Sequence, residues 1–126
     1  MTRPLRRGDE RGAVTAELAL VLPVLVAATV GLVWLLAVAA AQVRTVDAAR
    51  ETARAVARGD DEVTAISRGR QVAPPGSTVT VSRANGEVRV TVTGEVAGPG
   101  GLFSHLPTAT VRAEAVAAEE HPGGPP

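Results

Sequence analysis

The chain has 126 residues, with 13 basic and 13 acidic side chains and no cysteine, so its formal net charge is zero. This length allows one small domain with appendages and excludes a multidomain enzyme. The absence of cysteine excludes disulfides, thiolate metal sites and thiol nucleophiles. Trp34 and Phe103 are the only aromatic residues, too few for an enzyme pocket or a base-stacking surface, so no nucleic-acid partner is expected.

The chain opens with a short basic segment, residues 1–12, which holds four arginines and two acidic residues. An uncharged and almost wholly apolar run follows, from Leu18 to Val43. A helix of these 26 residues would be ~39 Å long, whereas the hydrocarbon core of a bilayer is ~30 Å thick. We therefore predict a membrane-spanning helix, and the membrane as a partner.

The orientation of this helix does not follow from arginine counts. Four arginines between residues 44 and 58 match the four that precede the run, so the positive-inside comparison is a tie. The N-terminal side is short and net positive with its free amine. This favours a cytoplasmic N-terminus and an extracytoplasmic C-terminal domain.

The sequence is compatible with three ways of processing the N-terminal region. Cleavage after Ala41, at the end of a stretch of small residues, would make the first 41 residues a signal peptide and release a small secreted binding domain. No cleavage would leave a single-span scaffold of a membrane complex such as a secretion system. Removal of the basic segment alone would leave the apolar helix as the mature N-terminus.

The junction between the basic segment and the apolar run carries the most specific signal. From Arg11 the chain reads RGAVTAE and then LALVLP, ending at Pro23. This resembles a type IV prepilin junction, with a leader ending in Gly12, a new N-terminus at Ala13 and Glu17 at the fifth mature position. The wider layout, over residues 11–119, resembles the TadE family of minor pilins of tight-adherence type IV pili, in the form found in actinobacteria.

The resemblance implies that a prepilin peptidase removes residues 1–12 and that the mature protein joins other pilin subunits and pilus assembly proteins. It also implies that Glu17 helps to register an incoming subunit. Gly12 has no Cβ, so the backbone there can lie extended in a protease cleft. Glu17 stands near the edge of the helix, where a carboxylate is less costly than at the bilayer centre. Its alternative role is to complement the helix dipole.

Pro23 lies inside the apolar run, where its missing N–H and its ring are expected to kink or locally open the helix. Beyond the membrane the helix is predicted to continue to about residue 58 and to end at Gly59. A second, short helix is expected from about Asp60 to Gly69. Apolar residues at helical spacing are predicted to share one face of the long helix: Val43, Val46, Ala49, Ala53, Val56 and Ala57.

Proline and glycine at residues 73–76 end the helical pattern and introduce a β region. Valines alternate with polar residues over Thr78–Arg83 and Glu87–Ala97, and Asn85-Gly86 between them predicts a hairpin, because both central positions need φ > 0. A third strand is expected over about residues 108–117. Three short strands have a marginal core unless they pack on the long helix or on neighbouring subunits.

The predicted fold class is α+β, a long N-terminal transmembrane helix that continues into a small domain with a short helix and a three-stranded antiparallel β-sheet. We expect a leader (1–12), the helix and its extension (13–58), the small domain (59–119) and a disordered tail (120–126). No enzymatic activity, cofactor or metal is expected, since His105 and His121 have no carboxylate at metal-ligand spacing. The expected location is the cell membrane or the extracellular pilus.

Overall fold

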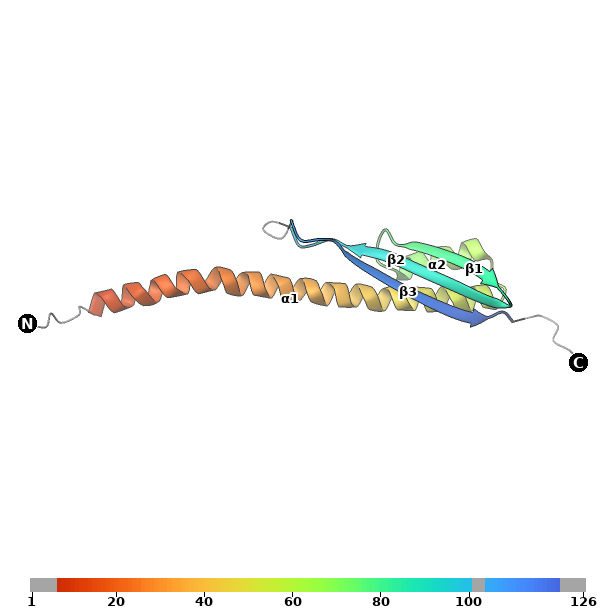
Figure 1. Cartoon of the computed structure of the whole chain (residues 1–126), viewed down its shortest axis with the longest axis horizontal. Coiled ribbons are helices and arrows are strands. Elements are labelled where there is room, and N and C mark those ends of the chain that lie inside the picture. Colours follow the sequence, from red (N-terminus) through yellow and green to blue (C-terminus); the bar gives the residue numbers. More distant parts are fainter. Residues whose placement is uncertain (1–6, 101–103, 121–126) are drawn as a thin grey trace, which may run out of the picture. The chain divides into compact units, whose positions relative to one another are not determined.

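The computed structural model describes residues 7–100 and 104–120 (Figure 1). Its elements, in chain order, are α1 (Arg7–Ala57), α2 (Glu62–Val72), β1 (Thr78–Ala84), β2 (Glu87–Val96) and β3 (Ala109–Ala118). The predicted α+β class, with one long helix, one short helix and three strands, is confirmed. Phe103, His121 and most of the predicted tail lie outside the described residues, as does the first half of the basic segment.

The chain divides into two compact units, one ending at Trp34 and one beginning at Leu35. Helix α1 contributes to both, since it is continuous from Arg7 to Ala57. Its first half holds most of the apolar run. Its second half belongs to the same unit as α2 and the sheet, and so supplies one wall of the small domain.

Gly59 ends α1, as the sequence predicts. Its φ is 93°, a left-handed conformation that glycine adopts without strain. The N–H groups of Gly59 and Asp60 donate to the carbonyl oxygens of Val56 and Ala55, each at 3.0 Å. These two bonds satisfy carbonyl groups that the end of a helix would otherwise leave unpaired.

Helix α2 begins two residues later and ends three residues later than predicted. Asp61 is its N-cap, because the carboxylate accepts hydrogen bonds from the N–H and the hydroxyl of Thr64, both at 3.0 Å. The helix then continues through Gly69 to Val72. The predicted end at Gly69 is wrong because this glycine allows a close approach to α1 and does not terminate α2.

The strands form an antiparallel sheet in the order β1-β2-β3. Asn85 and Gly86 connect β1 to β2 with φ values of 55° and 77°, which confirms the predicted two-residue hairpin. This turn pairs Ala84 with Glu87 and thereby sets the register of the hairpin. Strand β3 pairs with β2 along its whole length.

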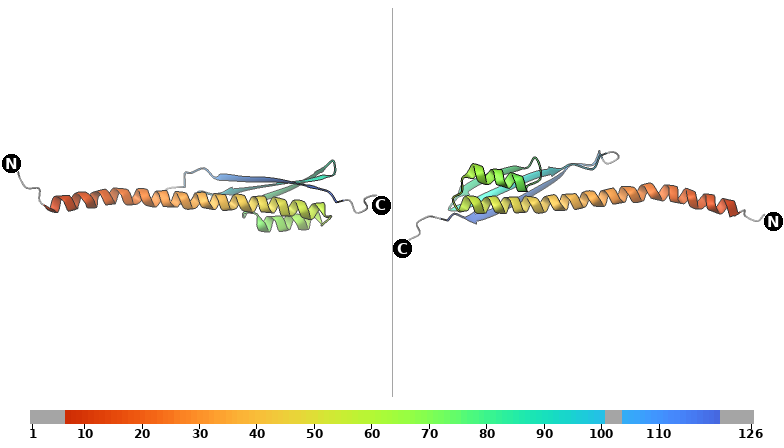
Figure 2. Two further views of the ribbon diagram at one scale, coloured as in Figure 1. Left: turned by 90° about the horizontal axis from the view of Figure 1, so that it is seen from below. Right: turned by 180° about the vertical axis from the view of Figure 1, so that it is seen from behind.

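One face of the sheet packs on the helices and forms the core. In β2, Val88, Val90 and Val92 are fully buried, while the residues between them are more exposed. Alanines from the second half of α1 and Ala65 of α2 complete this core, since small side chains allow close packing of helix and sheet. Figure 2 shows the sheet along one side of this half of α1. The sheet thus has the helix support that its small core requires.

The buried face of α1 differs in part from the predicted one. Val43, which belongs to the predicted apolar face, is 60 % exposed, whereas Thr45 and Thr52 are fully buried. Thr45 donates its hydroxyl to the Ala41 carbonyl oxygen at 2.8 Å, so this group is satisfied within the helix. A search for apolar residues misses both threonines, because their side chains carry a hydroxyl. Four other predicted positions are buried: Ala49, Ala53, Val56 and Ala57.

The approach of α2 to α1 at Gly69 predicts a steric effect. A Cβ built on Gly69 would lie 2.1 Å from the Thr52 hydroxyl oxygen and 3.7 Å from the Ala48 carbonyl oxygen. Gly69→Ala is therefore expected to destabilise the domain by about 1–3 kcal/mol, even though alanine is the better helix former. Thermal unfolding of the detergent-solubilised chain, followed by circular dichroism, measures this loss.

The matched control for this prediction is Thr52→Ala. It removes a hydroxyl that is buried without a hydrogen-bond partner in the part of the chain that the structure describes, so alone it should change stability little. The double variant Gly69→Ala/Thr52→Ala removes the clash, and its stability should return to the wild-type value or exceed it. A double variant as unstable as Gly69→Ala alone would contradict the contact.

Candidate functional site

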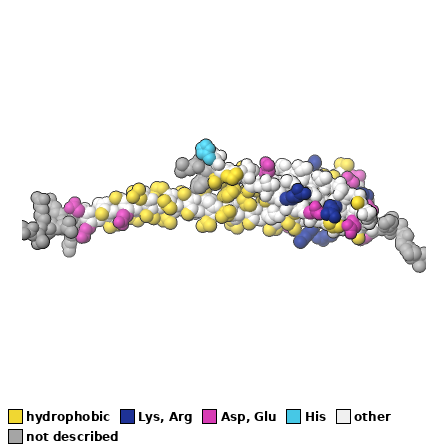
Figure 3. Space-filling model, viewed as in Figure 1, with side chains coloured by type: hydrophobic (Ala, Val, Ile, Leu, Met, Phe, Trp, Pro, Cys, Tyr) yellow, Lys and Arg dark blue, Asp and Glu magenta, His cyan; other side chains and the backbone are white. Residues whose placement is uncertain are grey.

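The first half of α1 carries an extensive exposed apolar surface. No residue of its most apolar 18-residue window is buried. Twelve large apolar side chains between Val14 and Leu36 are 48–75 % exposed, and Figure 3 shows hydrophobic side chains along this part of the helix. Apolar surface of this extent marks contact with lipid or with another protein. The described residues thus contain one helix that is long and apolar enough to span a membrane.

Two threonines in this half of α1 keep their polar groups paired inside the helix. Thr15 and Thr29 donate their hydroxyls to the carbonyl oxygens of Arg11 and Leu25, at 2.9 and 2.8 Å. A lipid environment requires such pairing, because hydrocarbon offers no hydrogen-bond partner. The two threonine hydroxyls therefore meet the condition that a membrane environment sets for polar side chains.

The predicted cleavage bond, between Gly12 and Ala13, lies inside α1. A Cβ added to Gly12 would meet nothing within 4 Å, so packing within the described chain does not require glycine here. A protease that binds an extended substrate must first unwind this turn. Glycine weakens a helix by about 1 kcal/mol relative to alanine, and so makes unwinding easier at this bond.

Glu17 is exposed on α1, four residues after Ala13. Within residues 7–100 and 104–120 it makes no ion pair or hydrogen bond. Positions four apart lie on the same face of a helix, about one turn from each other. A new amine at Ala13 would therefore lie on the same face as this carboxylate, at the edge of the apolar surface.

Pro23 lies inside α1, and the helix continues without a break on both sides of it. Proline has no N–H, so the carbonyl oxygen of Ala19 lacks its usual partner four residues later. The kink predicted at Pro23 stays a prediction. The site residues predicted from sequence, Gly12, Ala13, Glu17 and Pro23, thus lie along one half of one helix.

Gln42 is a residue whose role the sequence alone does not reveal. Its side-chain Nε2 donates to the Arg112 carbonyl oxygen at 2.9 Å, which ties β3 to α1 at the end of the apolar run. The sequence does show that Gln42 is the one amide in this almost wholly apolar run. A polar side chain in such a place is expected to have a specific partner.

The described residues hold no group of three or more His, Asp or Glu side chains able to bind a metal ion. His105 is exposed in the turn before β3. The chemistry that the described chain does present is therefore an apolar helix surface with a carboxylate near its N-terminal end.

These observations define a protein with one N-terminal helix able to span a membrane and a small α+β domain. The model of the family described as TadE-like protein matches residues 12–54, so the chain contains a TadE-like domain there. The match begins at Gly12 and ends within α1, and α2 and the sheet lie beyond it. No curated protein and no solved structure matches the chain.

Proposed function

We propose that the protein is a minor pilin or pilin-like assembly subunit of a tight-adherence type IV pilus, of the actinobacterial form. The observation that carries the proposal is the TadE-like match over residues 12–54, which includes the exposed apolar surface of α1. Lipid covers this surface while the protein is in the membrane. In a filament, apolar helices of neighbouring subunits take the place of lipid.

In this proposal a prepilin peptidase removes residues 1–12, and Ala13 becomes the mature N-terminus. The N-terminus of the precursor is cytoplasmic, and the small domain, residues 59–119, is extracytoplasmic. Residues 13–58 form the span and its extension, and residues 120–126 form the tail. The protein acts by assembly and not by catalysis.

Glu17 has the registry role in the proposal. Its carboxylate, unpartnered among the described residues, can pair with the free amine of Ala13 in a neighbouring subunit. Such a pair is strong in an apolar environment because water does not compete for it. Pro23 supports a change in helix shape between membrane and filament, since its helix lacks one backbone hydrogen bond.

The main alternative is a secreted binding domain released by cleavage after Ala41. Ala41 is 8 % exposed, and its carbonyl oxygen accepts the hydrogen bond from buried Thr45. The next residue, Gln42, is bonded to β3. Cleavage there requires unwinding of a helix segment that is packed in the domain, which disfavours this alternative. An uncleaved single-span scaffold is the second alternative.

The position of the mature N-terminus distinguishes the pilin proposal from the secreted domain and from the uncleaved scaffold. We expect the intact mass of the protein from membrane and sheared-surface fractions to correspond to a chain that begins at Ala13. A chain beginning at Gln42 would make the apolar run a signal peptide and contradict the proposal. A full-length chain in both fractions would favour the scaffold and remove the argument for filament entry.

A further inference from the structure

We propose that the small domain binds the head of an anionic phospholipid in a pocket where α1 leaves the membrane. The pocket has a volume of about 420 Å³ and lies within the unit that begins at Leu35. Three segments line it: α1 from Ala37 to Arg44, the turn at Pro74 and Pro75, and the end of β2. The inference rests on membrane insertion of α1, which the proposed function also requires, and not on pilus assembly.

The length of the apolar run places this pocket at the membrane surface. About 20 residues of helix cross the hydrocarbon core, whereas the run from Leu18 to Val43 has 26. With Glu17 at one interface, the last turns before Arg44 reach the level of the lipid head groups on the other side. Ala37 and Ala40, which line the pocket, are in those turns.

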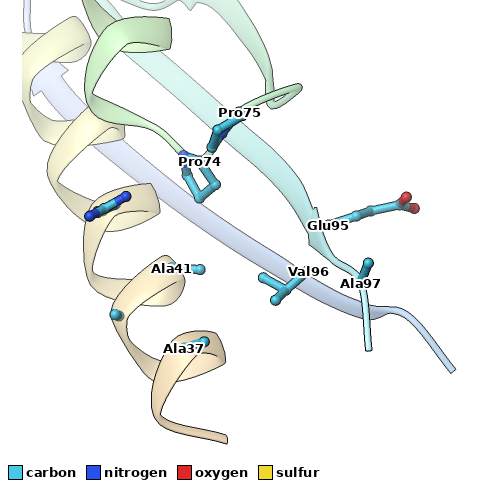
Figure 4. A pocket seen from close by; sticks show the side chains of 9 residues that line it. Ala37, Ala41, Pro74, Pro75, Glu95, Val96 and Ala97 are labelled. Atoms are coloured by element: carbon cyan, nitrogen blue, oxygen red, sulfur yellow. The ribbon is translucent and has the colours of Figure 1, made fainter. Parts of the chain in front are cut away.

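The apolar walls of the pocket are chemically compatible with the part of a phospholipid that lies just below the head group. Ala37, Ala41 and Val96 face one another across the space in Figure 4, and Pro74 covers one side. These apolar groups can contact the glycerol region and the first methylene groups of an acyl chain. A volume of about 420 Å³ is within the range of small-molecule pockets.

The charges at the pocket favour an anionic head group. Arg44 is the first charged residue after the apolar run, and in the part of the chain that the structure describes it forms no ion pair. Glu95 also borders the pocket, but its carboxylate points away from the space (Figure 4). A lone guanidinium beside an apolar pocket is suited to a lipid phosphate, which it can bind with two hydrogen bonds.

The chain contains an intrinsic fluorescent probe that can be used to study lipid binding at this pocket. Trp34 is the only tryptophan, and the chain has no tyrosine. It lies three positions before Ala37, a residue of the pocket wall, in the same continuous helix, which is a rise of about 4.5 Å. Bromine atoms on acyl chains quench tryptophan fluorescence on contact, and quenching therefore reports which lipid is nearby.

The experiment uses the purified full chain in vesicles of phosphatidylcholine and phosphatidylglycerol, with either one lipid or the other brominated. We expect phosphatidylglycerol to be enriched about fivefold at Trp34 over its share of the bilayer, the preference of one arginine for an anionic surface. Arg44→Gln should abolish the enrichment. Arg54→Gln, a matched loss of charge on the exposed side of the same helix beyond the pocket, should retain it.

A second variant separates the pocket from simple surface charge. Ala40→Leu fills the space while Arg44 remains, and Ala40 is exposed enough to accept the larger side chain. Loss of enrichment in Ala40→Leu supports the pocket, and retained enrichment overturns it. Equal quenching by both lipids in the wild type would also overturn it. None of these outcomes depends on whether the protein enters a pilus.

Discussion

Gly12→Ala is expected to leave most of the protein as a full-length chain that retains residues 1–12. Two effects act in the same direction. Alanine stabilises the helix around the Gly12–Ala13 bond by about 1 kcal/mol, which makes the extended substrate conformation about fivefold rarer. In the proposed peptidase the added methyl group would also need space beside the scissile bond, and such overpacking costs about 1–3 kcal/mol. Intact mass of the membrane fraction measures the ratio of full-length to mature chain.

Gly8→Ala is the matched control for this prediction. Gly8 and Gly12 both lie in α1, and a Cβ at either position meets nothing within 4 Å. The two substitutions therefore stabilise the same helix similarly, and only one of them alters the residue before the predicted cut. Gly8→Ala should slow processing by no more than about fivefold. If both variants were processed as fast as the wild type, the junction would lie elsewhere and the proposed leader would be wrong.

Glu17→Gln is expected to give a protein that inserts and is processed normally but is missing from filaments. Glutamine preserves the size of the side chain and removes its charge, so membrane insertion should be unchanged or easier. The substitution removes the proposed ion pair with the amine of a neighbouring Ala13. Loss of one partner of a buried charge pair costs about 2–5 kcal/mol, so the sheared-surface fraction should contain less than about one tenth of the wild-type amount of subunit.

The control is Glu10→Gln, which removes a carboxylate seven residues earlier in the same helix. Glu10 belongs to the proposed leader, so its substitution should not affect the mature subunit. Wild-type amounts of Glu17→Gln protein in the surface fraction would contradict the registry role. In that case the dipole interaction is the better account of Glu17, because a helix-terminal charge contributes only about 0.3–1 kcal/mol.

Much of the fold follows from short stretches of sequence. Asn85 and Gly86 specify their turn because both φ values are positive, and Gly59 ends α1 for the same local reason. The valines of β2 alternate with polar residues, so the buried face of that strand is apparent before any packing is known. The candidate processing site is equally local, since Gly12 and Glu17 lie within two turns of one helix.

The pocket and the inter-helix contact could not be predicted in this way. The pocket joins Arg44 to Pro74 and Val96, residues that are far apart in the chain and share no motif. The contact between Gly69 and Thr52 depends on how two helices meet. A glycine in a helical pattern indicates either the end of the helix or a close approach of a second helix. Only the position of the neighbouring helix distinguishes the two interpretations.

The apolar helix, the turns and the alternating strand residues are apparent in the amino-acid sequence, because these features depend on neighbours within a few positions. Which side of α1 is buried depends instead on packing between elements that are distant in the chain. Val43 is exposed and Thr45 is buried because the sheet and α2 cover one arc of the helix. A threonine whose hydroxyl bonds to its own helix can occupy that arc as readily as a valine.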